Sequence, residues 1–476
     1  MRKRVIASTA LALGLSLAVP VTTASATADG PHAGPGAPGI GDPYYPTYGN
    51  GGYDVSHYDL DLDYQPSTDR LSGTAVVTAT TTQGLTSFDL DFALDVSSVR
   101  VDGRPAHFTT SGEQELVITP PRTVPRGHRM TVAVTYSGVP STVQKYGFTS
   151  WQRTPDGGVA ANEPESAWWW FPSNDHPLDK ATYDVTVRVP KGEQAVSNGL
   201  LLSTRTAGGS TSYHWRQDDP QATYLATLAV GHFDITRSRT RTGVPVINAY
   251  STALAPAVKA NAQASVERTG EIIDFLSGYF GPYPFDAAGG YVPNVQSHFA
   301  LEAQTRVFYS PSFFAATTDT SVVAHELAHQ WWGDDVSLAR WSDIWLNEGF
   351  AGYAEYLWAE HEGTGTPQEL AQKVYDSHPA DDPFWTVKPG DPGAVDQFDD
   401  AVYDRGAVAI QALRDTIGDR AFLKLLKTWP AQHRYGNGTI AEFEKLAEHL
   451  SGQDLGDFFQ TWLYTPAKPA VFPAGH

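Results

Sequence analysis

The chain has 476 residues, of which 41% are hydrophobic and 18% are charged, and its formal net charge is -20 at pH 7. At roughly 150 residues per domain, this length predicts two or three folded units, and the apolar content excludes a chain that is disordered throughout. The acidic balance argues against partners such as nucleic acid or an anionic membrane. The sequence contains no cysteine, which excludes thiol catalysis and stabilisation by disulfides.

The first residues have the pattern of a secretory signal peptide. Three basic residues at positions 2–4 precede an apolar run over residues 5–19, and Ala24-Ser25-Ala26 supplies a cleavage site of the A-x-A type. The apolar run is shorter than the roughly 18 to 20 residues needed to span a bilayer. The sequence therefore predicts a signal peptide over residues 1–26 and a secreted, extracellular protein. Residues 27–52 are rich in Gly and Pro, which predicts a flexible leader.

Residues 53–246 have the pattern of an all-β domain. Apolar and polar residues alternate over residues 58–64, 88–96, 130–136 and 183–189, as expected for half-buried strands. Turn signals separate the strands, and no helical pattern occurs up to about residue 245. The sequence therefore predicts an antiparallel N-terminal domain.

Residues 247–472 are predicted to form a second, mainly helical domain. Helix-forming residues with apolar positions three and four apart begin near residue 257 and dominate from there on. The predicted helices cover about residues 257–280, 320–332, 343–362, 405–417, 420–427 and 440–450. The fold class is thus a multidomain chain with separate β and α parts.

The helix predicted over residues 320–332 contains the H-E-x-x-H pattern as His325-Glu326-Leu327-Ala328-His329. Four residues at about 100° each bring the second imidazole within roughly 40° of the first, so both rings can bind one ion. Glu326 then lies where it can act on a metal-bound water. The same pattern arises by chance in roughly a few per cent of such sequences, so the motif alone does not establish a metal site.

A third ligand is predicted in the next helix, where Glu348 follows His329 by nineteen residues. A catalytic zinc takes three protein ligands of nitrogen and oxygen type and leaves a fourth position open. The alternative is that Glu348 is a solvated carboxylate, but neighbours such as Phe350 are apolar, and an unpaired carboxylate is costly among them. The sequence predicts one zinc ion per chain, bound by His325, His329 and Glu348.

Two segments together, HELAHQWWGD over residues 325–334 and WLNEGFA over residues 345–351, resemble the gluzincin aminopeptidases of the aminopeptidase N family. The resemblance extends from about Tyr53 to Val471 and implies a thermolysin-like zinc-peptidase domain for residues 247–472. Family members commonly continue into a large helical domain that covers the active site. The chain stops soon after residues 458–463, so we expect a secreted bacterial type with two domains and a more open cleft.

The resemblance also assigns residues that bind the substrate. Glu302 falls at the position of a family glutamate that binds the free amino terminus, although Phe299 and Ala303 replace the Gly and Asn of that segment. Asn162-Glu163-Pro164 matches a second family segment, in which Glu163 corresponds to the other amine-binding glutamate. In that stretch Trp168 and Ser173 replace the usual Arg and Cys.

The same resemblance assigns a catalytic tyrosine. Val402 to Ala407 is similar to the family's Y-x-K-G-A segment, whose tyrosine stabilises the oxyanion, so Tyr403 is expected to have this role. From composition alone, a tyrosine is more often part of the core or the surface.

The predicted function is a zinc-dependent aminopeptidase that removes the first residue of peptides with a free amino terminus. Glu326 would take a proton from a zinc-bound water and pass it to the leaving amine. Three alternatives remain on this scaffold: a zinc endopeptidase, an epoxide hydrolase and a non-catalytic binding protein. The preferred first residue, the physiological substrate and the oligomeric state cannot be predicted from the sequence.

Overall fold

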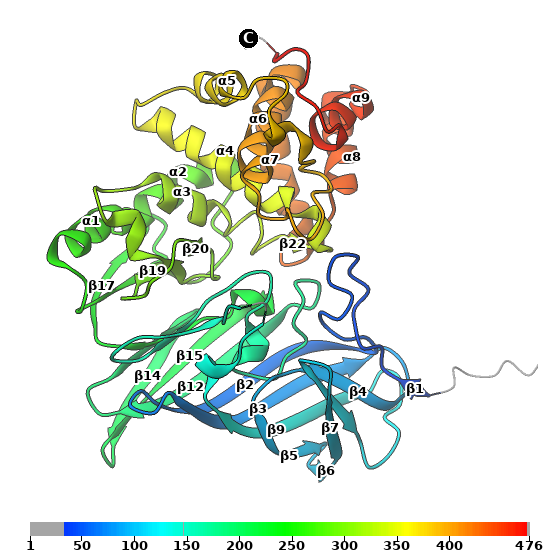
Figure 1. Cartoon of the computed structure of the whole chain (residues 1–476), viewed down its shortest axis with the longest axis vertical. Coiled ribbons are helices and arrows are strands. Elements are labelled where there is room, and N and C mark those ends of the chain that lie inside the picture. Colours follow the sequence, from blue (N-terminus) through cyan, green and yellow to red (C-terminus); the bar gives the residue numbers. More distant parts are fainter. Residues whose placement is uncertain (1–32, 146, 474–476) are drawn as a thin grey trace, which may run out of the picture. The chain divides into compact units, whose positions relative to one another are not determined.

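The computed structural model describes residues 33–145 and 147–473, and Figure 1 shows the course of the chain. The predicted signal peptide and the first leader residues, 27–32, lie outside this range. An N-terminal β-rich part is followed by a mainly helical part, as the sequence predicts. Within the described residues, no helix has both the length and the apolar content needed to cross a membrane.

The β-rich part is built on an eight-stranded sheet with the order β14-β15-β12-β2-β3-β9-β5-β6. Its strands are β2 (Tyr53–Gln65), β3 (Arg70–Thr81), β5 (Asp95–Val101), β6 (Arg104–Pro105), β9 (Arg129–Gly138), β12 (Ala181–Pro190), β14 (Leu200–Ala207) and β15 (Ser210–Gln221). Three of the predicted alternating segments lie within β2, β9 and β12, and their apolar side chains are buried. Pairing is antiparallel throughout this sheet, except that β12 runs parallel to β2.

Two four-stranded sheets complete the β-rich part, with the orders β1-β4-β8-β7 and β10-β11-β16-β13. The first contains β1 (Gly34–Pro35), β4 (Leu85–Asp91), β7 (His107–Ser111) and β8 (Glu115–Thr119). The second contains β10 (Trp151–Arg153), β11 (Gly158–Ala160), β13 (Gln194–Ser197) and β16 (Leu228–Gly231). Strand β11 ends three residues before Glu163, so this sheet positions one predicted substrate-binding residue.

The prediction of a single strand over residues 88–96 is wrong. Its alternating residues are divided between β4 and β5, which belong to different sheets. Between these strands the backbone N–H groups of Phe92 and Ala93 donate to the carbonyls of Gln114 and Trp168. Phe92 and Leu94 are buried even so. The alternation of apolar and polar residues therefore continues through the bend between the two strands, because Phe92 and Leu94 are buried there.

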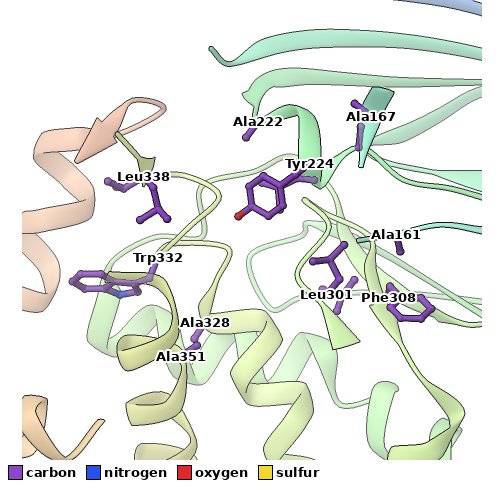
Figure 2. Close-up of a cluster of buried hydrophobic side chains, with 14 of the residues drawn as sticks. Ala161, Ala167, Ala222, Tyr224, Leu301, Phe308, Ala328, Trp332, Leu338 and Ala351 are labelled. Atoms are coloured by element: carbon purple, nitrogen blue, oxygen red, sulfur yellow. The ribbon is translucent and has the colours of Figure 1, made fainter. Parts of the chain in front are cut away.

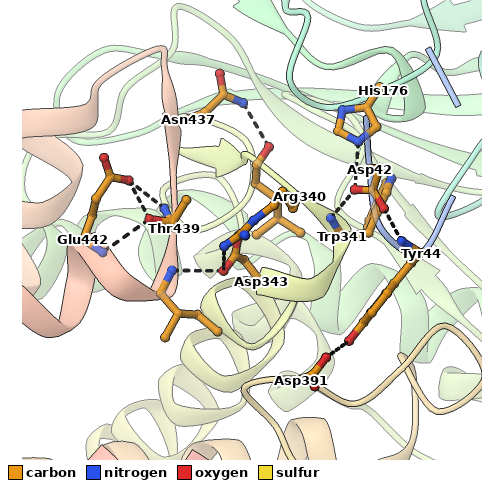
Figure 3. A network of polar contacts seen from close by, with 12 residues as sticks. Asp42, Tyr44, His176, Arg340, Trp341, Asp343, Asp391, Asn437, Thr439 and Glu442 are labelled. Carbon is orange, nitrogen blue, oxygen red and sulfur yellow. Dashed lines mark hydrogen bonds and ion pairs between the residues drawn. The ribbon is translucent and has the colours of Figure 1, made fainter. Parts of the chain in front are cut away.

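Residues 33–52 are packed against the rest of the chain, in contrast to the flexible leader expected from their composition. Asp42 accepts hydrogen bonds from the backbone N–H of Trp341 (2.8 Å) and from His176 Nε2 (3.1 Å). The Tyr44 hydroxyl donates to Asp391 Oδ1 (2.6 Å), and Figure 3 shows how these contacts join distant parts of the chain. Gly and Pro here shape turns, while buried polar and aromatic side chains hold the segment in place.

A five-stranded mixed sheet with the order β17-β18-β19-β21-β20 introduces the helical part. Its strands are β17 (Phe233–Arg239), β18 (Pro245–Ser251), β19 (Ala288–Val292), β20 (Ala300–Leu301) and β21 (Val307–Tyr309). Strand β17 and the start of β18 precede residue 247, where the sequence analysis placed the start of the helical domain. The edge strand β20 ends directly before Glu302.

The longer helices are α1 (Pro256–Val266), α2 (Thr269–Phe280), α3 (Ser321–Ala328), α4 (Trp345–His361), α5 (Pro367–Ser377), α6 (Asp400–Ile417), α7 (Asp419–His433) and α8 (Ile440–Ser451), followed by the short α9 (Gly456–Phe459). The single helix predicted over residues 257–280 is two helices, because the Thr269 hydroxyl donates to the Val266 carbonyl (2.6 Å) at the break. Helix α5 was not predicted; a capping box between Thr366 and Glu369 starts it.

Helix α3 is shorter than the helix predicted over residues 320–332. After His329 the backbone makes wider turns, in which the N–H groups of Asp334 and Asp335 donate to the carbonyls of His329 and Gln330. Gly333 has a φ of +134°, a conformation that side chains rarely adopt, and an added Cβ would lie 3.1 Å from Asn347. These turns end the helix at the second histidine and keep the following residues close to Asn347 of α4.

Close packing joins α3 to α4. The Trp332 and Phe350 rings are stacked with centroids 3.7 Å apart. Figure 2 shows Ala328 and Ala351 beside each other in the core, on the same side of the cluster as Trp332. Small residues at this contact let the two helices approach, and the aromatic stack fixes their relative rotation. The packing therefore sets the distance between the predicted metal ligands of the two helices.

The seam between the β-rich part and the mixed sheet is held by Arg306, which is fully buried. Its guanidinium donates to the carbonyls of Ser197 (3.3 Å) and Gly199 (2.9 Å) on one side, and to those of Ile247 (2.5 Å) and Ala288 (2.9 Å) on the other. Burial lowers the pKa of Arg306 to about 10, so it remains a cation at neutral pH. One side chain thus satisfies four carbonyls from two structural parts.

We expect Arg306→Lys to lower the free energy of unfolding by about 2 to 5 kcal/mol, because an ammonium cannot reach all four carbonyls and leaves buried acceptors unpaired. Urea denaturation followed by circular dichroism measures the change. Arg205→Lys, on the exposed strand β14, is the control and should change stability by less than about 0.5 kcal/mol. Equal effects of the two substitutions would show that Arg306 does not hold the seam.

Candidate metal centre and active site

Helices α3 and α4 bring the three predicted metal ligands together. His325 Nε2 and His329 Nε2 lie 3.3 Å and 3.4 Å from the same oxygen, Glu348 Oε2. The possible ligand atoms of this set all lie within 4.8 Å of one another. His325 and His329 are on one face of α3 because they are four residues apart, and Glu348 is in the first turn of α4.

The second nitrogen of each histidine has its own partner. His325 Nδ1 lies 2.9 Å from Glu355 Oε1, and His329 Nδ1 lies 3.0 Å from the Trp332 carbonyl. These partners fix the ring orientation and leave both Nε2 atoms facing Glu348. Two imidazole nitrogens and one carboxylate, with no thiolate, form a donor set that fits zinc with an open position.

The histidines and the carboxylates of the cluster shift one another's pKa toward their charged forms. Burial alone would lower the pKa of His329, but Glu348 and Glu302 raise it to about 9. Burial would raise the pKa of Glu348, whereas His329 and His325 lower it to about 2. The site thus keeps Glu348 ionised and attracts positive charge to its surroundings.

Glu326 lies in the same space as these ligands. Its carboxylate, the carboxylate of Glu302 and a ring nitrogen of His329 have atoms within 4.8 Å of one another. Burial raises the pKa of Glu326 to about 8, an effect that the two histidines oppose and that Glu302 and Glu348 increase. A carboxyl group with a pKa near neutrality is suited to both accepting and donating a proton.

The two predicted amine-binding carboxylates, Glu163 and Glu302, also reach this space. Both line the same cavity as the histidines, and burial raises the pKa of each. Glu302 Oε1 accepts from the Tyr224 hydroxyl (2.9 Å), whereas Glu163 Oε1 is buried without a hydrogen-bond partner among the described residues. A buried carboxylate oxygen without a partner is costly, and a cationic ligand would satisfy it.

Tyr403 enters the cavity from α6. Its ring is stacked beside that of His325, with centroids 6.1 Å apart and an interplanar angle of 20°. Burial and the nearby Glu348 raise the pKa of Tyr403 well above its usual range, so its hydroxyl stays protonated and can donate. All seven predicted site residues therefore line one cavity of about 640 Å³.

The structure adds positioning residues that sequence reasoning missed. The Gln330 side chain donates to the Glu302 carbonyl (2.9 Å) and accepts from the Thr305 N–H (2.9 Å). Thr305 has a φ of 64°, which is rare for a β-branched residue, and these bonds hold it there. Glu355 follows Glu348 by seven residues on α4, and this spacing on one helix face was the available signal.

One long-range contact connects the site to the β-rich part. Lys180 Nζ donates to the carbonyls of Asp334 (2.6 Å) and Asp335 (2.9 Å), in the turns that follow α3. Burial lowers the pKa of Lys180 to about 8, while both aspartates oppose that effect. Of the two replacements noted after Glu163 in the sequence, Trp168 donates from its indole to Glu165 Oε2 (2.7 Å) and braces the loop that carries Glu163. Ser173 Oγ is buried without a hydrogen-bond partner among the described residues.

Comparisons with known proteins agree with this arrangement. Residues 55–225 match the peptidase M1 N-terminal domain, and residues 264–462 match the peptidase family M1 domain. Aminopeptidase M1 of Arabidopsis thaliana is 27% identical over 336 residues, which are 66% of this chain and 37% of that protein. Glutamyl aminopeptidase of Rattus norvegicus is 28% identical over 363 residues, 69% of this chain and 37% of that protein. The chain thus spans well under half of the length of these relatives.

Solved structures match over nearly the whole chain. The M1 zinc metallopeptidase of Deinococcus radiodurans is 28% identical, with a TM-score of 0.81, and the match covers 92% of this chain and 100% of that chain. A mutant of the Deinococcus radiodurans M1 zinc metallopeptidase bound to a Tyr-Ser-Ala substrate has a TM-score of 0.82 at 28% identity and the same coverage. Both domain models of peptidase family M1 match this chain, and the solved structures share its fold across both domains. The chain belongs to peptidase family M1, the gluzincin family of aminopeptidase N that its motifs resemble.

Proposed function

We propose that this protein is a zinc-dependent aminopeptidase that removes the first residue from peptides with a free amino terminus. One observation carries the proposal: a metal-binding set and two additional buried carboxylates, Glu163 and Glu302, line a single cavity. Aminopeptidases among the relatives and the peptide-bound Deinococcus structure support it. The signal-peptide pattern of residues 1–26 supports action outside the cell.

His325, His329 and Glu348 would hold one zinc ion. When bound, zinc lowers the pKa of water and polarises a carbonyl group. The histidines offer Nε2 because Glu355 and the Trp332 carbonyl occupy their other nitrogens. The carboxylate of Glu348 stays ionised between them, so the set carries the charge that a divalent cation requires.

Glu326 would accept a proton from the attacking water and donate it to the leaving amine. The raised pKa of its buried carboxyl fits this double role, because neither protonation state is strongly preferred near neutral pH. The Tyr403 hydroxyl, kept protonated by its surroundings, would donate to the oxyanion that forms on the substrate.

Glu163 and Glu302 would bind the protonated amino terminus and thereby set which bond is cut. The α-amino group has a pKa of about 7.7 to 8.0, so it is largely a cation near neutral pH and pairs with carboxylates. A chain that continued beyond this position would place a neutral amide against two buried carboxylates. This arrangement disfavours an endopeptidase, in which the peptide extends past the amine site.

We expect the purified protein to contain one zinc ion per chain and to lose activity with 1,10-phenanthroline, since the two groups of possible ligands in the cavity share His329 and cannot both hold an ion. Mass spectrometry of the metal content and peptide hydrolysis before and after chelation are the measurements. Added zinc should restore activity, and His329→Ala should abolish stoichiometric binding. Full activity in metal-free protein would refute the ligand assignment.

We expect Glu326→Gln to retain zinc while kcat falls by about 10² to 10⁴, because the amide keeps the shape but cannot accept a proton. Steady-state kinetics and metal content are measured on the same preparation. Glu113→Gln, an exposed change of the same chemistry, is the control and should leave both unchanged. Tyr403→Phe should lower kcat by about 10² to 10³ with little change in KM. Joint loss of zinc and activity in Glu326→Gln would contradict the assigned role.

We expect the parent enzyme to cut a peptide with a free amino terminus and to leave its acetylated twin intact. Glu163→Gln and Glu302→Gln should each lower kcat/KM for the free peptide by about ten- to a thousandfold, since a lost charged hydrogen bond also misplaces the scissile bond. Mass spectrometry of the products identifies the bond that is cut. Equal cleavage of the acetylated peptide would mean an endopeptidase, and the metal site would remain.

A further inference from the structure

A second cavity, of about 910 Å³, adjoins the active-site cavity. Asn162, Glu163, Phe299 and Phe398 line both of them, so the two spaces meet at the amine-binding carboxylate. Neither the metal set nor Glu326 lines the second cavity. It is therefore open to a part of the substrate that lies beside the amine and away from the metal.

Six aromatic side chains line the second cavity, beside a group of polar ones. Seven large hydrophobic side chains are exposed among the described residues, and four of them, Phe148, Phe299, Val395 and Phe398, line this cavity. Single exposed apolar residues are ordinary, but a cluster at one concave place marks a binding surface. One of these residues, Phe299, stands where the family pattern carries Gly.

Among the charged groups of this cavity, Glu163 belongs to the amine-binding pair, and the other two, Lys145 and Glu165, are paired within the protein. Lys145 Nζ lies 3.2 Å from Glu165 Oε2 and 2.9 Å from Gln114 Oε1, and it also lies over the Tyr48 ring. Glu165 also accepts from the Trp168 indole. A charged ligand group would have to displace this pairing, whereas an apolar group would not.

The N-terminal segment supplies one wall. The Tyr45 hydroxyl donates to Gln397 Oε1 (2.7 Å), and the Tyr44 hydroxyl accepts from the Gly393 N–H (2.8 Å). The Tyr45 ring is stacked on Tyr48, with centroids 4.4 Å apart. Residues 42–48 thus join the β-rich part to the loop that precedes α6, as Figure 3 shows for Asp42 and Tyr44.

We propose that the second cavity receives the side chain of the substrate's first residue, and that Tyr45, Phe299 and Phe398 make the enzyme selective for a large aromatic residue there. The inference rests on the proposed aminopeptidase function. The Cα of the first residue carries the amine held by Glu163 and Glu302, the carbonyl that faces the metal set, and the side chain. Because the amine and the carbonyl are both placed in the active-site cavity, the side chain on the same Cα points toward the wall that the two cavities share.

The size and polarity of the first side chain then determine which substrates the enzyme prefers. An alanine side chain buries little surface in a cavity of this volume, whereas an aromatic ring can stack on the wall residues. The N-terminal segment has a specific part in this selection, because the Tyr45 ring lines the cavity, stacks on Tyr48 and is held by the hydrogen bond of its hydroxyl to Gln397. A segment with the composition of a linker is thereby part of the specificity pocket.

The test measures kcat/KM for amino-acid amides of Phe, Ala, Glu and Arg. We expect the parent to prefer Phe over Ala and over Glu by at least about tenfold. Phe398→Ala and Tyr45→Ala should each reduce the Phe-to-Ala ratio about tenfold, while Tyr45→Phe, which keeps the ring, should preserve it. Leu202→Ala removes an equally exposed apolar side chain on β14, outside this cavity, and is the control.

A charge exchange gives an independent test. Phe299→Asp should raise the Arg-to-Phe ratio of kcat/KM by about tenfold or more, because a carboxylate at the shared wall can pair with a guanidinium. Unchanged ratios in Tyr45→Ala, Phe398→Ala and Phe299→Asp would overturn the pocket assignment. An active parent with no preference for Phe would overturn the aromatic selectivity. Absence of hydrolysis of every amide by zinc-loaded protein would instead overturn the proposed function itself.

Discussion

The buried excess of carboxylates around the two histidines is the constraint on which the rest of this structure depends. Glu163, Glu302, Glu326 and Glu348 line one cavity, and burial raises the pKa of the first three. Such a group of like charges repels itself and is expensive to desolvate. Nearby cations stabilise such a group, and in the proposed aminopeptidase a metal ion and the substrate's ammonium group would supply that charge.

Contacts with the surrounding structure hold these carboxylates in place. Gln330 fixes the backbone around Glu302, the Tyr224 hydroxyl binds its carboxylate, and Glu355 orients His325. Lys180 connects the turns after α3 to the β-rich part. These hydrogen bonds oppose the repulsion that would otherwise move the side chains of the cavity apart.

Much of the site could be predicted from the sequence because helical geometry is local. The positions of His325, His329 and Glu348 follow from spacing along α3 and α4, and family resemblance supplied Glu163, Glu302 and Tyr403. The role of Gln330 depends on a loop that meets it only in the folded chain. The strand break near Phe92 likewise depends on backbone partners far away in sequence. The packing of residues 33–52 could not be predicted because their composition is that of a linker. Their long-range hydrogen bonds produce no periodic pattern in the sequence.

The seam that Arg306 holds has a consequence for the selectivity of the proposed aminopeptidase. Glu302 and the metal set belong to the helical part, whereas Glu163 follows a strand of the β-rich part. Loosening of the seam would separate Glu163 from Glu302 while α3 and α4, packed through Trp332 and Phe350, still hold the ligand set. Such a molecule could still hydrolyse peptide bonds, but it would no longer select the first bond of the peptide. In the proposed aminopeptidase, the seam would therefore control which bond is cut, whereas the packing of α3 against α4 would control whether any bond is cut.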